Sequence, residues 1–291
     1  MIDVVMPTYN RLESLRTVID SYICQSNLGF IIIVDDASTE NIAQFARELD
    51  QKHPGKIIYH RIQRKTTTPD VRNIGVGLSK NEYVFMGEDD VILPPDHFEV
   101  LINNMSKYGA DIIAGRRIYL RTGQTFEEAV SIANRDHRPI FVRKPFEGYF
   151  ERFVGTATEV LYLHANVLIK RSVFDKVVYD PKYIGNAFRE ETDFLLRAND
   201  AGFHLWLIPD TLSYHLKNTN LNKSGGARKN RFVYEFQVWV NNFRFFIKNK
   251  NIFYKKYNVK NIYLFALSTV IFRYTYFIKR RLDWKKSYEK K

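Results

Sequence analysis

Short apolar runs alternate with amphipathic stretches along the first 100 residues, and this alternation limits the possible folds more than any other feature of the sequence. The apolar runs predict strands at residues 2–6, 30–34, 56–60 and 83–86. Apolar residues at helical spacing predict helices at residues 12–22, 42–49 and 71–78. Strands that alternate with helices favour a parallel sheet with right-handed crossovers and helices on both faces. We therefore expect an α/β protein.

The next 115 or so residues, up to about residue 215, follow a less regular pattern. Residues 122–155 are rich in charge, Gly and Pro, which indicates a long excursion over the surface. The remaining segments predict a helix at 190–201 and strands at 111–114, 160–169, 205–208 and 212–214.

The charge of the chain is concentrated at its end. The 291 residues carry 44 Lys and Arg against 32 Asp and Glu, a net charge of +12. Residues 217–291 alone carry 19 Lys and Arg and three acidic residues, so this segment has a charge of +16 and the rest of the chain −4. The polar stretch 218–230, which contains Gly225-Gly226, predicts a boundary near residue 220. We expect an α/β domain at 1–220 and a basic, aromatic-rich amphipathic helical segment at 221–291.

A single cysteine excludes a disulfide scaffold and a cysteine-rich zinc module. Cys24 is expected on the apolar side of the first helix. The N-terminal sequence lacks the basic start and long apolar stretch of a signal peptide, so a cytoplasmic location is expected.

Acidic pairs follow two of the predicted strands. Asp35-Asp36 and Asp89-Asp90 each come directly after or close behind an apolar run. An isolated pair of this kind has a simple explanation as a helix cap or a turn. Two pairs at the carboxyl ends of parallel strands should, however, meet at the edge of the sheet where ligands bind. Four carboxylates there repel one another unless a cation or a cationic partner sits between them, and oxygen ligands favour Mg²⁺ or Mn²⁺.

Five short motifs resemble those of the family 2 glycosyltransferases, which have the GT-A fold. They occur in the family's order over residues 1 to about 215, each weak alone and strong together. The motifs are Val5-Met6-Pro7-Thr8-Tyr9-Asn10, Val34-Asp35-Asp36-Ala37-Ser38-Thr39, Arg72-Asn73-Ile74-Gly75, Glu88-Asp89-Asp90 and Glu190-Glu191-Thr192-Asp193. The resemblance implies a Rossmann-like, mostly parallel sheet flanked by helices, and an inverting transfer of a sugar from a nucleotide-sugar donor. A UDP-sugar is favoured as the donor, with GDP- and dTDP-sugars as alternatives.

The resemblance also implies a role for each motif residue. Glu191 is the expected general base, with Glu190 as the alternative, because the family's acidic pair is most often Glu-Asp. Asp90 is the expected ligand of Mn²⁺ or Mg²⁺, although the family's metal motif is often Asp-x-Asp and this chain has Glu88-Asp89-Asp90. The nucleobase of the donor is expected to contact Asp36, beside a wall formed by Pro7, Thr8 and Tyr9. Arg72 is expected near the base and the phosphates, and Asp89 is expected to contact the ribose.

Two further residues are weaker candidates. His215 follows a predicted strand and is a candidate to complete the metal's coordination or to contact the diphosphate, since a neutral imidazole suits a metal. Asn166 is a candidate contact for the donor diphosphate or the acceptor. The alternatives are a structural histidine and a turn asparagine.

Two other enzyme classes fit poorly. A two-metal hydrolase usually places histidines beside its carboxylates, whereas the seven histidines here are scattered. A dehydrogenase needs a Gly-x-Gly-x-x-Gly loop after the first strand, and Pro7-Thr8-Tyr9-Asn10 is not such a loop.

Aromatic and aliphatic residues alternate with Lys and Arg in the last 64 residues. Two apolar stripes at helical spacing are Phe232, Val233, Phe236, Val240, Phe243, Ile247 and Tyr263, Leu264, Leu267, Val270, Ile271, Tyr274, Ile278. The uncharged run 261–272 has 12 residues, too few for the roughly 20 that span a bilayer. Helices with an aromatic face and a basic face are typical of the membrane interface.

We therefore expect a peripheral protein on an anionic membrane surface at the inner face of the cell membrane, acting on a glycan or lipid-linked acceptor. The alternative is that the helices only pack on the catalytic domain. The alternative function is a non-catalytic or nucleic-acid-binding protein on the same fold that uses the basic segment, since aromatic residues interleaved with Arg can stack bases. Nucleic acid is not the expected partner, because no recognition module is visible. The oligomeric state is not predicted.

Overall fold

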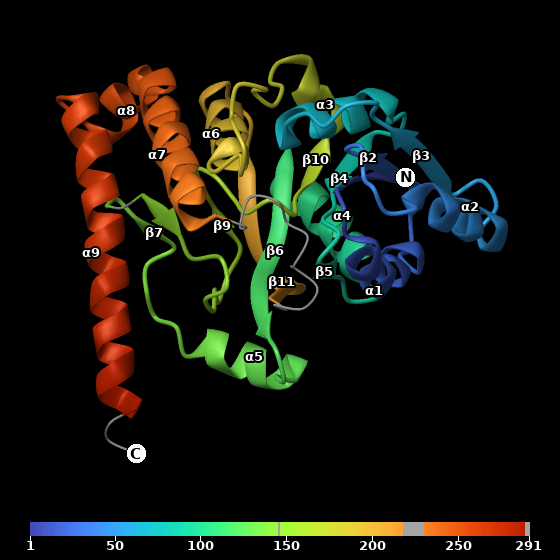
Figure 1. The fold of residues 1–291 in the computed structure, drawn as a ribbon, viewed down its shortest axis with the longest axis horizontal. Coiled ribbons are helices and arrows are strands. Elements are labelled where there is room, and N and C mark those ends of the chain that lie inside the picture. Colours follow the sequence, from blue (N-terminus) through green and yellow to red (C-terminus); the bar gives the residue numbers. More distant parts are fainter. Residues whose placement is uncertain (145, 218–229, 289–291) are drawn as a thin grey trace.

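The computed structural model describes residues 1–144, 146–217 and 230–288 (Figure 1), with side chains for all of these except Lys217, Arg231 and residues 276–288. The predicted boundary at 218–230 falls almost wholly outside the described residues, and so does the side chain of Ile278.

A mixed, mostly parallel sheet forms the centre of the molecule. Its nine strands in the described residues run in the order β3-β2-β1-β4-β10-β6-β11-β5, with β9 paired to β11. The strands are β1 (Ile2–Thr8), β2 (Leu28–Asp35), β3 (Ile57–Arg61), β4 (Tyr83–Met86), β5 (Val91–Ile92), β6 (Ile112–Arg121), β9 (Thr158–Glu159), β10 (Leu168–Lys170) and β11 (Leu205–Lys217). Strands β3, β2, β1 and β4 are parallel, as are β6 and β11, whereas β10, β5 and β9 pair antiparallel with their neighbours.

Helices cover both faces of this sheet. Val4 and Met6 of β1 point into one core, with α1 (Leu12–Ile23), α2 (Ile42–Lys52) and α4 (His97–Tyr108). Val5 points into the other core, beneath α3 (Thr68–Leu78) and α6 (Glu190–Asp200). The alternation of side chains along a strand explains this division, because successive residues face opposite sides of the sheet. The expected α/β architecture is confirmed.

The second half of the sheet differs from the prediction in two places. Residues 160–167 are not a strand, and only Leu168 and Ile169 of the predicted segment pair, as part of β10. The two strands predicted at 205–208 and 212–214 are the single strand β11, whose pairing with β6 is interrupted between Leu207 and Leu212. Pro209 lies in this interruption and cannot donate to a ladder.

The surface excursion at 122–155 contains secondary structure of its own. It holds α5 (Phe126–Asn134), which begins with a capping box between Thr125 and Glu128, and a small hairpin of β7 (Phe141–Val142) and β8 (Glu147–Gly148). A short 3₁₀ helix, η1, spans Arg171–Asp175. Cys24 was expected in the core and is exposed, because α1 ends one residue before it.

Three C-terminal helices pack beside α6, at the end of the molecule opposite α2 (Figure 1). They are α7 (Arg231–Lys248), α8 (Lys250–Tyr257) and α9 (Ile262–Tyr288). Phe245, Phe246 and Phe253 are fully buried, and their rings lie 5.1–5.9 Å from that of Phe146 in the β7–β8 hairpin. Among the described residues, no helix has the length and apolar character to cross a membrane.

Most of the predicted apolar stripe of α7 is exposed, whereas Phe243 of the same stripe is half-buried against the core. Phe232 is 87% exposed and Phe236 65%. The opposite face of α7 is buried and carries amides as well as apolar groups: Val238, Asn241, Asn242, Phe245, Phe246 and, at its end, Asn249. In α9, Tyr263, Leu264, Leu267 and Ile271 are exposed, whereas Val270 of the same predicted stripe is buried.

Candidate functional site

A cavity of about 520 Å³ lies beyond the carboxyl ends of β1, β2 and β4. Among the sequence-predicted site residues, eight line it: Pro7, Thr8, Tyr9, Asp36, Arg72, Asp89, Asp90 and His215. Glu190 and Glu191 lie directly behind one of these residues, Arg72. Asn166 is buried and bonded to the Met86 carbonyl, and it is not among the lining residues.

Arg11 holds the acidic pair that ends the loop after β4. Its guanidinium lies 2.8 Å from Asp89 Oδ1 and 2.6 Å from Asp90 Oδ2. Thr8 Oγ1 also donates to Asp89, at 2.9 Å. Burial raises the pKa of Asp89 to about 7, against the opposing charge of Arg11. Burial also opposes the ionisation of Asp90, but the charge and the hydrogen bond of Arg11 at 2.6 Å lower the pKa of Asp90.

Sequence reasoning missed Arg11, although it anticipated that the carboxylates need a cation. The position of Arg11 could have indicated its role, because it directly follows the Tyr9-Asn10 motif at the carboxyl end of the first strand.

The other acidic pair is divided between two tasks. Asp36 lines the cavity and accepts a 2.7 Å hydrogen bond from the Thr66 backbone N–H. Asp35 is fully buried and bonds Tyr59 and Arg61 instead, at 2.7 and 3.0 Å. Three of the four carboxylates therefore converge on the cavity, and the fourth secures the end of β2 to β3. Burial raises the pKa of Asp36.

Tyr9 and Lys65 form the wall next to Asp36. The Lys65 ammonium lies 3.0 Å from the centre of the Tyr9 ring and 3.8 Å from Asp36 Oδ2. Lys65 belongs to no motif, because it sits in the loop before α3. The result is an aromatic face and a carboxylate with a cation between them.

A buried arginine links the cavity to the acidic pair at the start of α6. Arg72 Nε lies 2.8 Å from Glu190 Oε1, and Arg72 Nη2 lies 3.7 Å from Glu191 Oε1. The side chain of Glu190 is 2% exposed and that of Glu191 is 32% exposed. Burial raises the pKa of Glu191, and the charge of Arg72 opposes that rise. Of the two glutamates, Glu191 is thus the accessible one.

Asp90 and His215 are the cavity side chains that suit a divalent cation. His215 Nε2 lies 3.5 Å from Asp90 Oδ2. Burial, followed by the charge of Arg117, lowers the pKa of His215, which favours the neutral imidazole that metals bind. The described residues contain no group of three or more His, Cys, Asp or Glu side chains arranged around an ion. One carboxylate and one imidazole nevertheless fit Mg²⁺ or Mn²⁺ when phosphates supply further ligands.

The far wall of the cavity comes from residues that no motif marks. Gly185, Asn186 and Phe188 precede α6, and Tyr234 and Gln237 project from α7. The C-terminal helices therefore contribute directly to the cavity.

Known proteins similar to this chain are glycosyltransferases. The sequence model of the family described as "Glycosyl transferase family 2" matches residues 3–178. The poly(ribitol-phosphate) beta-N-acetylglucosaminyltransferase TarP of Staphylococcus aureus is 29% identical over 133 residues, 44% of this chain and 40% of that protein. The amylovoran biosynthesis glycosyltransferase AmsB of Erwinia amylovora is 25% identical over 268 residues, 88% of this chain and 82% of that protein.

The structure of S. aureus TarS residues 1–349 in complex with UDP-GlcNAc superposes with a TM-score of 0.63 at 13% sequence identity. The match covers 86% of this chain and 66% of the TarS chain, and at this identity it shows the fold alone. The family match covers more than half of the sequence, and the chain therefore belongs to glycosyl transferase family 2 and has the GT-A fold.

Proposed function

We propose that this protein transfers a sugar from a nucleotide-sugar donor to a hydroxyl group of an acceptor, with inversion at the anomeric carbon. The observation that carries the proposal is that Asp36 and the Asp89-Asp90 pair line one cavity, to which Glu191 is linked through the lining residue Arg72. TarS supports a UDP-sugar as the donor, because its structure holds UDP-GlcNAc. GDP- and dTDP-sugars are the alternatives.

The donor would lie across the carboxyl ends of β1, β2 and β4. Asp36 would accept a hydrogen bond from the nucleobase beside Tyr9, and Asp89 would accept one from the ribose. Lys65 lies over the Tyr9 ring and would move aside for the base. Arg72 and Arg11 line the same cavity and supply positive charge near the diphosphate. Anions are bound most strongly by such charge-assisted hydrogen bonds.

Asp90 and His215 would hold Mn²⁺ or Mg²⁺. A bound cation there would stabilise the charge that develops on the leaving diphosphate. Arg11 shares the Oδ2 oxygen of Asp90 at 2.6 Å, so it adds a second positive charge at the same place.

Glu191 would take the proton from the acceptor hydroxyl as the hydroxyl oxygen attacks the anomeric carbon. Its 32% exposure leaves the carboxylate accessible, whereas Glu190 is enclosed by its bond to Arg72. The raised pKa of Glu191 suits a general base, because a stronger base accepts a proton more readily.

The acceptor is proposed to be a glycan or a lipid-linked precursor at the inner face of the cell membrane. Two relatives support this class, since the name of TarP specifies poly(ribitol-phosphate) and that of AmsB specifies amylovoran biosynthesis. The exposed stripe of α7, with Phe232 and Phe236, is proposed to dock on anionic lipid. The +16 charge of residues 217–291 supports an anionic surface as its partner.

The test is the release of nucleoside diphosphate from UDP-, GDP- and dTDP-sugars by the full chain, with Mn²⁺, with Mg²⁺ and with EDTA. We expect turnover of one donor class, loss of turnover in Asp90→Ala, and little change in Asp200→Ala, an exposed position of α6. Failure of every donor under all three conditions would overturn the proposal. Full activity of Asp90→Ala would overturn the assignment of the metal.

A further inference from the structure

The turn that leads into α6 has a backbone that few sequences adopt unaided. Gly185, Ala187 and Arg189 all have positive φ angles, of 56°, 48° and 75°. A positive φ is unfavourable for residues other than glycine and persists only where the surroundings impose it. Residues 184–189 lead directly into Glu190, the first residue of α6. The path of this turn therefore decides where Glu190 and Glu191 lie.

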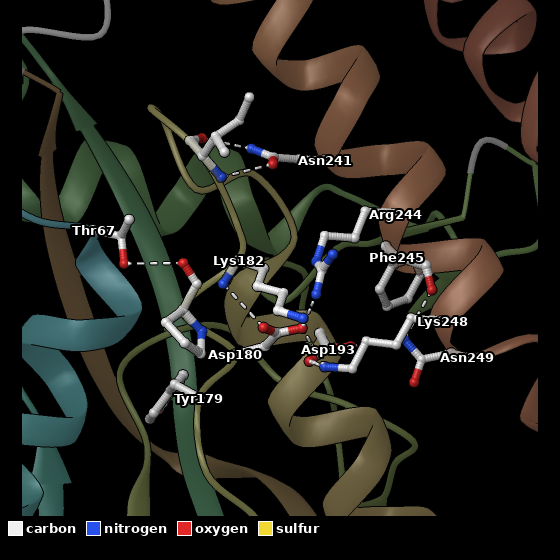
Figure 2. A network of polar contacts seen from close by, with 12 residues as sticks. Thr67, Tyr179, Asp180, Lys182, Asp193, Asn241, Arg244, Phe245, Lys248 and Asn249 are labelled. Carbon is white, nitrogen blue, oxygen red and sulfur yellow. Dashed lines mark hydrogen bonds and ion pairs between the residues drawn. The ribbon is translucent and has the colours of Figure 1, made fainter.

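Asn241 of α7 binds this turn through its backbone. The Ile184 N–H donates to Asn241 Oδ1 at 3.0 Å, and Asn241 Nδ2 donates to the Ile184 carbonyl at 2.8 Å (Figure 2). The same amide nitrogen donates to Asn186 Oδ1 at 3.2 Å. Asn241 is fully buried and does not line the cavity. Its amide therefore satisfies both backbone groups of Ile184, as a neighbouring strand would.

Gln237, one helical turn earlier, binds the next part of the turn. The Asn186 N–H donates to Gln237 Oε1 at 3.1 Å. A Cβ at Gly185 would lie 2.1–2.3 Å from the Gln237 amide, so only glycine allows the turn to approach α7 this closely. The fit between the turn and α7 is thus steric as well as polar.

Arg189, the last residue of the turn, is held by hydrogen bonds to Phe146 and to α7. Arg189 Nη1 donates to the Phe146 carbonyl at 2.6 Å, and Arg189 Nε donates to Asn242 Oδ1 of α7 at 3.3 Å. Asn242 is in turn bonded to Thr269 of α9 at 3.3 Å.

Beyond the turn, Asp193 in the first turn of α6 accepts hydrogen bonds from Lys248 and Asn249 at 2.8 and 2.7 Å (Figure 2). The segment that carries Glu190 and Glu191 is held by C-terminal residues on both sides.

We infer that α7 is part of the catalytic apparatus, and that Asn241 and Gln237 are positioning residues that set the location of the general base Glu191. The inference rests on the proposed function. A displacement of about 1 Å at a reacting group can lower the rate about 100-fold, so hydrogen bonds to a turn next to the base have a large effect on turnover.

The first experiment measures UDP release from UDP-GlcNAc by the full chain. We expect Asn241→Ala to lower kcat by about 10- to 100-fold with the donor KM changed less than about threefold, because Asn241 itself does not line the cavity that would hold the donor. The acidic limb of its pH–rate profile should shift, since Glu191 changes its surroundings. Asn251→Ala, an exposed amide of α8, is the matched control and should behave as the wild type.

A pair of substitutions separates the hydrogen bond from general destabilisation. Gln237→Met keeps the length of the side chain and removes the acceptor of the Asn186 N–H, whereas Gln237→Glu keeps that acceptor. We expect a lower kcat in Gln237→Met and recovery of most of it in Gln237→Glu. Equal kcat values in Asn241→Ala and wild type, or losses in kcat that follow thermal stability and are not recovered by Gln237→Glu, would overturn the inference.

Hydrogen exchange gives a readout that does not depend on turnover. The Ile184 amide should exchange about 3- to 10-fold faster in Asn241→Ala, and the Asn186 amide should do so in Gln237→Met. Unchanged exchange at both amides would show that α7 does not hold the turn. If wild type releases no nucleoside diphosphate from any donor, the proposed function fails, and the exchange rates still decide whether α7 holds the turn.

Discussion

The catalytic sheet and the helix α7 arrange polar and apolar residues in opposite ways. In the sheet, apolar side chains such as that of Val5 fill the two cores. Carboxylates such as that of Asp90 gather beyond the strand ends and line the cavity. In α7, Phe232 and Phe236 are exposed, whereas Asn241 and Asn242 are buried and bonded. A buried amide is favourable only when its hydrogen bonds are satisfied. The comparison shows that the buried amides of α7 bind specific partners, which are the turn before α6 and, through Asn242, Thr269 of α9.

Glu191→Gln should have the largest effect and sharpens the comparison on the catalytic side. We expect turnover to fall by about 100- to 10,000-fold, because general-base catalysis is lost while the size of the side chain is kept. The measurement is kcat for nucleoside diphosphate release, with donor affinity determined separately and expected to be unchanged. Glu190→Gln is the companion variant. An active Glu191→Gln beside an inactive Glu190→Gln would assign the base to Glu190.

Asp193→Ala tests whether the C-terminal helices are an integral part of the fold. Asp193 is fully buried and bonds Arg197, Lys248 and Asn249. Removal of one partner of a buried ion pair costs about 3–5 kcal/mol. We expect the free energy of unfolding in urea to fall by that amount. Asp200→Ala removes a 44% exposed carboxylate from the same helix and should change the free energy of unfolding by less than about 0.5 kcal/mol. Equal stability of the two variants would mean that α7 contributes little to the fold.

The double substitution Phe232→Ser with Phe236→Ser tests the exposed face of α7. Loss of two partly inserted rings should weaken binding to vesicles that contain phosphatidylglycerol by about 2 kcal/mol, or roughly 30-fold. Turnover of a water-soluble donor should stay unchanged. Ile132→Ser, which removes a 48% exposed apolar side chain from α5, is the control. Vesicle binding that is unaffected by the double substitution would argue against docking through this face.

The pH dependence of kcat gives the smallest effect, about tenfold per pH unit. The base acts as a carboxylate, so activity requires a pH above the pKa of Glu191. Burial raises that pKa, and the acidic limb should therefore lie above the ordinary glutamate value of about 4.3. A rate measured from pH 4 to 8 at saturating donor checks this. A limb at or below the ordinary value would contradict the environment assigned to Glu191.

The sequence allowed the first four strands and the part of the cavity wall at their carboxyl ends to be predicted, because most of the motifs there follow a strand and parallel strands end at one edge. This rule, alone or together with the family resemblance, was enough to assign three residues to the cavity: Asp36, Asp90 and His215. Arg11 and Lys65 could not be assigned in this way, since a single basic residue in a loop gives no periodic signal. The role of Asn241 was also invisible. Helical periodicity in apolar residues marks Phe232 and Phe236 as one face of α7, but it does not tell whether that face or the amide face is buried.

The central claim is that the cavity beside Asp36 binds the nucleotide of a sugar donor, and titration calorimetry with UDP in the presence of Mn²⁺ tests it most directly. The account predicts that UDP binds the wild type and that Asp36→Ala weakens binding by about 10- to 100-fold, the effect of losing a hydrogen bond to a charged group. Asp200→Ala should bind as the wild type does. Equal UDP affinity of Asp36→Ala and wild type would contradict the account, as would the absence of binding by UDP, GDP and dTDP alike.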